Sequence, residues 1–470
     1  MTLSLPRLSD VRRRVVLCAT LLATHVCGCA AGKHAEMAQQ MDRLLSGLYS
    51  PSEPGAAILV AKDGQVIFRR GYGLANVEHQ VPITPDTVFR IASMTKQFTA
   101  VAILMLMEQG RLSLDDCVAK YLPDYPEGKR ITIRHLLRHT SGIWDYIRLE
   151  EVRRGMRRDV SVDELIDLFK DKPLMFEPGE RKAYCNSGFT LLGVIIEKVS
   201  GQPYAEFLQK SIFTPAGMRG STIDTHDKII FHRAAGYVRR NGELCNAPFI
   251  SMTEPFANGN IASSVNDLFR WNEALFNGLI KPETLKLALT PTTLNEGTVT
   301  DSGCGFGISQ IRGRKAAIHG GKIHGFGGYG LMVPTERLYV VWLSNHPIPG
   351  PRPPSDLVAE LAAIALEEPY VRRPAVALPD ELLDAYVGVY VGLDDGRTAG
   401  LEQCALEQRG GTLWLHIFGM QFEAVAVSRT EFCLKDRFPA SFTIRAHDNV
   451  PTHLELDWPL GVNQVFRRQD

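Results

Sequence analysis

The segment from Thr95 to Gln109 constrains the fold more than any other, because it is apolar on nearly every side. It is made of good helix formers and stops at Gly110. A helix that is apolar all round has no face to give to water, so it must lie inside a core. We therefore expect a buried central helix in a domain large enough to surround it. The apolar side chains of the segment include Ala100, Val101, Ile103, Leu104, Leu106 and Met107.

Strand-like segments lie on both sides of this helix in the sequence. Residues 56–61 and 65–68 are apolar and flank a Lys-Asp-Gly turn, which predicts a β-hairpin. Strand-like sequence returns between residues 305 and 344 and precedes a predicted helix at 355–367. Before the hairpin, the residues from Gly32 onward are expected to be mobile. Helical segments fill the middle of the chain, at 161–169, 189–199, 204–212 and 265–276.

This order predicts an α/β (α+β) fold for residues 40–368. The N-terminal and C-terminal pieces would share one sheet flanked by helices, with a helical subdomain inserted between them. The chain has 470 residues, about three times the length of an average domain, so a second domain is expected. Residues 369–379 are predicted to be a linker, and residues 380–470 a small all-β domain, sandwich or barrel. Its predicted strands are 386–391, 412–418, 422–427, 441–446 and 453–456.

The first 29 residues are typical of a signal peptide. Three arginines precede the apolar run Val15–Ala23, which is too short to span a bilayer. The run ends in Val26-Cys27-Gly28-Cys29, which resembles a bacterial lipobox with Cys29 as the lipidated residue; an ordinary signal peptide with incidental cysteines is the alternative. We expect an exported protein, periplasmic or anchored by lipid to the bacterial envelope.

Charge and composition exclude several classes of protein. Lys plus Arg and Asp plus Glu both number 52, so the chain lacks the positive charge of a dedicated nucleic-acid binder. With 45% hydrophobic and 22% charged residues it is neither disordered nor fibrous. The six cysteines after the leader form no Cys-x-x-Cys pair, and no zinc-protease motif occurs, so neither a metal nor another cofactor is expected.

Ser93 and Lys96 open the apolar helix and are the first candidate site. Side chains three residues apart share a helix face, so the Lys96 amine can lie beside the Ser93 hydroxyl. A lysine that is desolvated loses its proton readily and can activate a serine. The alternative is a capping serine with a solvated lysine, but this helix has almost no polar face for that lysine.

Two further elements carry polar groups suited to catalysis. Tyr184 and Asn186 lie two residues apart in a predicted loop and can offer a phenol and an amide on one side; helix capping is the alternative. The segment from His319 to Gly330 is rich in glycine, which indicates close approach to its backbone and amides that could bind an oxyanion. His319 and His324 could instead be metal ligands, but no acidic residue accompanies them.

Taken in order, these elements resemble the serine β-lactamase and penicillin-binding-protein superfamily. The specific likeness is to its class C-like branch, which includes class C β-lactamases, DD-peptidases, D-aminopeptidases and family VIII carboxylesterases. Ser93-x-x-Lys96, Tyr184-x-Asn186 and His319-Gly320-Gly321 carry it. It spans about residues 54 to 367 and includes the segments 87–93, 112–116, 131–142, 191–193 and 259–268.

The resemblance implies a role for each residue. Ser93 would be the acylated nucleophile and Lys96 its activator. Tyr184 would pass the proton to the leaving group and then activate the hydrolytic water, and Asn186 would hold the acyl chain. The amides of Ser93 and Lys322 would form the oxyanion hole.

The third element departs from the Lys-Thr-Gly of many β-lactamases. His319, Gly320 and Gly321 are more similar to the esterase and peptidase members. A histidine carries a positive charge only part of the time near neutral pH, which argues against efficient penicillin hydrolysis.

Two functions follow as hypotheses. The first is an exported serine hydrolase that cleaves an ester or amide through an acyl-enzyme, on short acyl esters, D-amino-acid peptides or, weakly, β-lactams. The second is a non-catalytic protein on the same fold that binds peptidoglycan fragments or another ligand.

Overall fold

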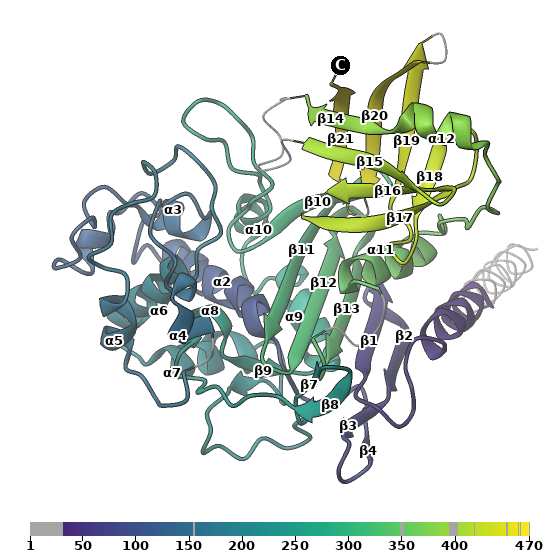
Figure 1. Cartoon of the computed structure of the whole chain (residues 1–470). Helices are drawn as coiled ribbons and strands as arrows, with labels where there is room; N and C mark the ends of the chain where they lie inside the picture. Colours follow the sequence, from purple (N-terminus) through teal and green to yellow (C-terminus); the bar gives the residue numbers. More distant parts are fainter. Residues whose placement is uncertain are drawn as a thin grey trace, which may run out of the picture.

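The computed structural model describes residues 32–153, 156–347, 352–393, 403–417, 419–447, 450–458, 460 and 462–469. The predicted signal peptide and Cys29 lie outside these ranges. No helix within them is sufficiently long and apolar to cross a membrane. Figure 1 shows a large part in which helices flank a sheet, and a β-barrel formed by the C-terminal residues.

One antiparallel sheet organises the larger part, in the strand order β10-β11-β12-β13-β1-β2. Strand β1 pairs with β13 along its whole length, with Ala56 opposite Ser344. The two ends of this part of the chain therefore share a sheet, as predicted. The strands are β1 (Ala56–Lys62), β2 (Gln65–Tyr72), β10 (Gly307–Ile311), β11 (Arg314–Ile323), β12 (Phe326–Val333) and β13 (Leu338–Ser344).

Helices cover both faces of this sheet. Alternate residues of β1 point to opposite faces: Leu59 packs in the cluster that contains α2 (Thr95–Glu108) and α9 (Val265–Phe276), whereas Ile58 packs with α11 (Pro354–Ala365). We call these the α2 face and the α11 face. Because both faces are buried, β1 is a continuous apolar run rather than an alternating one.

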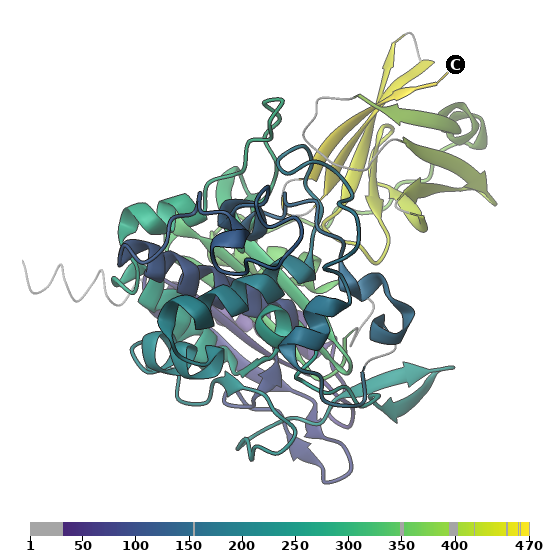
Figure 2. The same ribbon diagram turned by 90° about the vertical axis from the view of Figure 1, so that its left-hand side faces the viewer.

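Helix α2 forms the centre of the helical region beside the sheet, and its side chains from Thr95 to Leu104 are buried. It packs against α6 (Asn186–Ser200) and α8 (Phe256–Gly259). Figure 2, seen from this side, shows the helices in front of the sheet. The prediction of a buried central helix is confirmed. The other helices include α3 (Ile133–Leu137), α4 (Glu150–Arg153), α5 (Val162–Asp167), α7 (Tyr204–Leu208) and α10 (Pro282–Ala288).

The C-terminal strands form a closed barrel, which decides between the two predicted architectures. Strand β14 pairs with both β15 and β21, so the sheet has no free edge. Tyr390, Leu415 and Phe466 are fully buried inside it. The strands are β14 (Gly388–Gly392), β15 (Gln403–Arg409), β16 (Thr412–Ile417), β17 (Met420–Ala426), β18 (Glu431–Leu434), β19 (Ser441–His447), β20 (Val450–Trp458) and β21 (Val462–Arg468).

The structure corrects the expectation of a mobile stretch after Gly32. Residues 32–46 are helical. Met41 and Leu45 are fully buried in the cluster on the α11 face, so this helix is held by packing against the sheet. Met37, Met41, Leu44 and Leu45 recur at the spacing of one helix face, so the helical signal was present in the sequence.

Candidate active site

Ser93 lies in a short turn that precedes α2. The turn, η1 (Ala92–Met94), follows β5 (Phe89–Arg90), which pairs with β9 (Ile261–Ser263). Ala92 has a φ of +48°, a left-handed conformation that costs a residue with a Cβ about 1 kcal/mol. Such strain is typical of functional sites and here presents Ser93 to a pocket.

Lys96 lies one turn further on and is completely buried. Its Nζ donates hydrogen bonds to Ser93 Oγ (3.2 Å), to Asn186 Oδ1 (2.8 Å) and to the carbonyl oxygen of Asn258 (2.9 Å). Burial, which penalises the charged amine, lowers the pKa of Lys96 to about 7. A substantial share of neutral amine is therefore present beside the Ser93 hydroxyl at neutral pH, as a general base requires.

Asp145 fixes the orientation of Asn186. Its carboxylate accepts the Asn186 backbone N–H (3.1 Å) on Oδ1 and the side-chain Nδ2 (3.0 Å) on Oδ2. The amide oxygen of Asn186 is thereby turned to Lys96. Asn186 is the first residue of α6, three residues before the predicted start of that helix. Asp145 was missed in the sequence because a single carboxylate after Trp144 carries no spacing signal.

Tyr184 lies at the mouth of the same site, directly before α6. Its ring centroid is 4.9 Å from Lys96 Nζ, and its phenol shares a hydrogen bond with Ser93. Although 43% of its surface is exposed, the atoms packed around the phenol raise its pKa above the ordinary value, and the bond with Ser93 acts in the opposite direction. The phenol is therefore protonated at neutral pH and can donate.

His139 holds the segment that carries Tyr184. Its Nδ1 accepts the Cys185 backbone N–H (3.1 Å), and its ring lies 4.5 Å from the Tyr184 ring. Burial keeps the pKa of His139 well below its ordinary value, so the ring stays neutral and Nδ1 stays an acceptor. No spacing in the sequence singles out His139, because its bond to Cys185 depends on tertiary contact.

The glycine-rich strand β11 passes close to the Ser93 turn. A Cβ on Gly321 would lie 2.2 Å from the Ile91 carbonyl oxygen and 3.1 Å from the Ser93 backbone nitrogen. On β12, a Cβ on Gly328 would lie 2.8 Å from Met94 Sδ. The close approach predicted from the glycines is present, and it brings the backbone of residues 320–322 beside the Ser93 amide.

His319 differs from what its residue type alone implies. Burial, and then the nearby Lys96, lowers the pKa of His319 to about 4. The expectation that His319 is charged part of the time near neutrality is therefore wrong: the ring is neutral, and its Nδ1 donates to the Gly320 carbonyl oxygen (2.6 Å). Lys322 is exposed.

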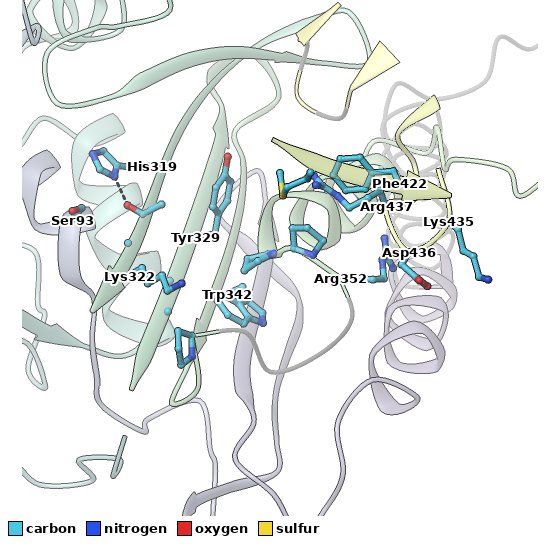
Figure 3. Close-up of a pocket in the computed structure, with 18 of the residues that line it drawn as sticks. Ser93, His319, Lys322, Tyr329, Trp342, Arg352, Phe422, Lys435, Asp436 and Arg437 are labelled. Atoms are coloured by element: carbon cyan, nitrogen blue, oxygen red, sulfur yellow. Dashed lines mark hydrogen bonds between the residues drawn. The ribbon is translucent and has the colours of Figure 1, made fainter. Parts of the chain in front are cut away.

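These residues open onto a pocket of about 950 Å³. One end is lined by the predicted site residues Ser93, Tyr184 and His319–Lys322, and the other by residues of the barrel. In Figure 3, Ser93 and Phe422 lie at opposite ends, with Tyr329 and Trp342 between them. The sequence could not predict this wall, because it depends on how the barrel docks. Its barrel residues are Trp414, Met420, Gln421, Phe422, Glu423, Lys435, Asp436 and Arg437.

Among the described residues, no group of three or more His, Cys, Asp or Glu side chains is arranged to hold a metal ion. His319 and His324 share a strand-and-turn segment without an acidic neighbour in the sequence. The cysteines at 117, 185, 245, 304, 404 and 433 are all free. The arrangement around Ser93 is thus an amine, a phenol, an amide and backbone N–H groups, which together suit acyl transfer.

Comparison with known proteins agrees with this fold. The Beta-lactamase family matches residues 36–365. Penicillin-binding protein 4* of Bacillus subtilis (strain 168) is 30% identical over 430 residues, which cover 84% of this chain and 91% of that protein. D-aminopeptidase of Gluconobacter oxydans (strain 621H) is 32% identical over 345 residues, 72% of this chain and 64% of that protein.

A solved structure, the octameric penicillin-binding protein homologue from Pyrococcus abyssi, superposes with a TM-score of 0.61. It is 27% identical in sequence, and the match covers 93% of this chain and 99% of that one. The fold and these relatives together indicate a β-lactamase-like hydrolase. The chain belongs to the β-lactamase family.

Proposed function

We propose that this protein cleaves an ester or amide bond through an acyl-enzyme on Ser93. The observation that carries the proposal is the buried Lys96 amine, 3.2 Å from Ser93 Oγ, whose pKa burial lowers to about 7. A serine needs a neighbouring base to act as a nucleophile. Burying a lysine lowers the stability of the fold, so a fully buried lysine beside a serine points to a functional role.

In the acylation step, Ser93 Oγ bonds to the substrate carbonyl carbon and its proton passes to neutral Lys96. The carbonyl oxygen takes negative charge near the amides of Ser93 and Lys322. When the bond to the leaving group breaks, that group receives a proton from Tyr184, and Lys96 returns a proton to Tyr184. Water then attacks the acyl carbon and gives a proton to neutral Lys96. The Ser93 ester bond breaks, Lys96 returns the proton to Ser93 Oγ, and the acid is released.

The neutral His319 bears on the substrate. A permanent cation beside the nucleophile would favour substrates with a free carboxylate, such as β-lactams or D-Ala-terminated peptides. With the pKa of His319 at about 4, the ring offers only a neutral hydrogen-bonding group at neutral pH. We therefore infer that esters and amides without a carboxylate at this position are better substrates than penicillins.

The proposal is tested by intact-mass spectrometry and by hydrolysis of p-nitrophenyl butyrate and a penicillin. We expect turnover of the ester and, with penicillin, at most an adduct that maps to Ser93. Ser93→Ala should abolish turnover and labelling, while Ser52→Ala, an exposed serine outside the pocket, should change neither. Turnover retained in Ser93→Ala would exclude this nucleophile. Tight ligand binding without product in the unaltered protein would favour the non-catalytic alternative.

We also propose that the protein is exported and anchored through lipid on Cys29. The support is the arginine-led apolar segment and the Cys27-Gly28-Cys29 sequence after it. Labelling of cells with a fatty-acid analogue should mark the full-length protein and fail to mark Cys29→Ser. An unlabelled protein of the size expected after cleavage would indicate an ordinary signal peptide.

A further inference from the structure

The active-site pocket extends round the edge of the sheet to the face opposite Ser93. Strand β11 pairs with β10 only as far as Ile318, so residues 319–323 form a free edge. Gly320 stands opposite Tyr329, and Tyr329 opposite Trp342, in one row across three strands. This row belongs to the α11 face, since Trp342 and Tyr329 pack in that cluster. The same pocket therefore reaches both faces.

The barrel closes the far side of this extension. Trp414 of β16 and Met420 and Phe422 of β17 line the pocket, and Met420 is 48% exposed. We name the part of the pocket lined by Tyr329, Trp342, Trp414, Met420 and Phe422 the distal arm. Its lining side chains come from the sheet and from the barrel, and all are aromatic or aliphatic. This composition is typical of a site for an apolar group.

Three cations that line the pocket beside the distal arm already have carboxylate partners. Lys435 Nζ lies 2.7 Å from a Glu423 carboxylate oxygen. Arg437 Nε lies 2.7 Å from Asp356 Oδ2. Arg352 pairs with Glu360 at 2.6 Å. A substrate carboxylate placed here would have to compete for a cation that is already paired, so the arm disfavours an anionic occupant.

The arm lies on the acyl side of the scissile bond. Tyr184, the proposed proton donor to the leaving group, packs against Lys96 and His139 on the α2 face. A leaving group must sit beside Tyr184 on the α2 face, whereas the arm continues past Gly320 to Tyr329 and Trp342 on the α11 face. Figure 3 shows Tyr329 and Trp342 between Ser93 and Phe422. The acyl part of the substrate is the part that can enter it.

Resting on the function proposed above, we propose that the distal arm binds the acyl part of the substrate, and that this part is an extended, uncharged apolar group. The barrel is then part of the substrate-binding site. The protein would be selective for long acyl esters or amides over acetyl ones, and this selectivity would depend on β17.

The test compares kcat/KM for p-nitrophenyl octanoate and p-nitrophenyl acetate. We expect the unaltered enzyme to prefer octanoate. In Phe422→Ala the octanoate-to-acetate ratio should fall by about tenfold, the loss typical of one or two methylene contacts in an apolar pocket. Phe422→Leu, which keeps an apolar side chain and protects the fold, should lower the ratio less. The matched pair is Met420→Ala, which should lower the ratio, and Val450→Ala, a 60% exposed barrel residue outside the pocket, which should not.

A ratio unchanged in both Phe422 variants and in Met420→Ala would overturn the inference, as would an unaltered enzyme that prefers acetate. A second readout separates this result from failure of the proposed function. Binding of octanamide to the Ser93→Ala protein, measured by calorimetry, needs no catalysis. It should be weakened by Phe422→Ala whether or not esters are turned over, and equal binding by both proteins would refute the distal arm.

Discussion

At the scale of single residues, the pKa of Lys96 determines how activity should depend on pH. Only the neutral amine can take the Ser93 proton, and burial lowers the pKa of that amine to about 7. We therefore expect kcat/KM for p-nitrophenyl butyrate to rise with pH, with its midpoint near 7, and to level off above it. His319, with a pKa of about 4, adds no step near neutrality.

The variant Lys96→Arg checks this assignment, because arginine stays charged throughout the accessible pH range. It should lower kcat/KM by at least about a hundredfold, the usual contribution of a general base. A Lys96→Arg enzyme with near-normal activity and an unchanged midpoint would show that another group is being titrated.

Asp145 is a positioning residue, and a second prediction follows from its two roles. Its carboxylate accepts both N–H groups of Asn186, and its charge raises the pKa of Lys96 against the effect of burial. Asp145→Asn should therefore lower kcat/KM and also move the pH midpoint to lower pH. A purely structural role would reduce activity without moving the midpoint, so the pH profile distinguishes the two. Thr132→Ala, which removes a helix cap outside the pocket, serves as control.

At the scale of elements, the close approach of β11 to the Ser93 turn yields a third prediction. Because a Cβ on Gly321 would lie 2.2 Å from the Ile91 carbonyl oxygen, Gly321→Ala must push the strand and the turn apart. We expect a loss of stability of about 2 kcal/mol and a larger relative loss of activity, since the two oxyanion amides lie on these two elements. Gly47→Ala, where nothing lies within 4 Å, should be neutral in urea unfolding and in kinetics. Full activity in Gly321→Ala would contradict this account of the oxyanion hole.

The sequence predicted those elements whose pattern is local. The apolar runs of β1 and α2 predicted a strand of a hairpin and a buried central helix, and α9 begins and ends where it was expected. Strands β15, β18 and β21 were not predicted, because each has only a short stretch in which apolar and polar residues alternate. Ser93, Lys96 and Tyr184 were found through spacing, whereas Asp145 and His139 act through contacts between distant segments that no spacing reveals.

At the scale of the whole molecule, a buried ion pair joins the barrel to the larger part. Asp356, on α11, is fully buried, and its carboxylate receives Arg437 Nε at 2.7 Å and Nη2 at 3.3 Å. The Arg437 guanidinium also lies 4.3 Å from the Trp458 ring centroid. Arg437 also lines the pocket, so its pairing with Asp356 holds this wall of the barrel in place relative to α11.

Removing one partner of that pair leaves the other charge buried and uncompensated, which typically costs about 3 kcal/mol or more. Asp356→Asn should therefore lower the thermal midpoint by several degrees and speed limited proteolysis within residues 369–379, the predicted linker, most of which is already exposed. The same chemical change in the exposed pair Arg445–Glu455, made as Glu455→Gln, should cost less than about 1 kcal/mol, because that pair is solvated. If the two variants were equally stable and equally resistant to protease, the buried pair would not be what holds the barrel against α11.

Loss of docking should also change substrate selectivity. Phe422 reaches the pocket only while the barrel stays docked, so the octanoate-to-acetate ratio should fall in Asp356→Asn.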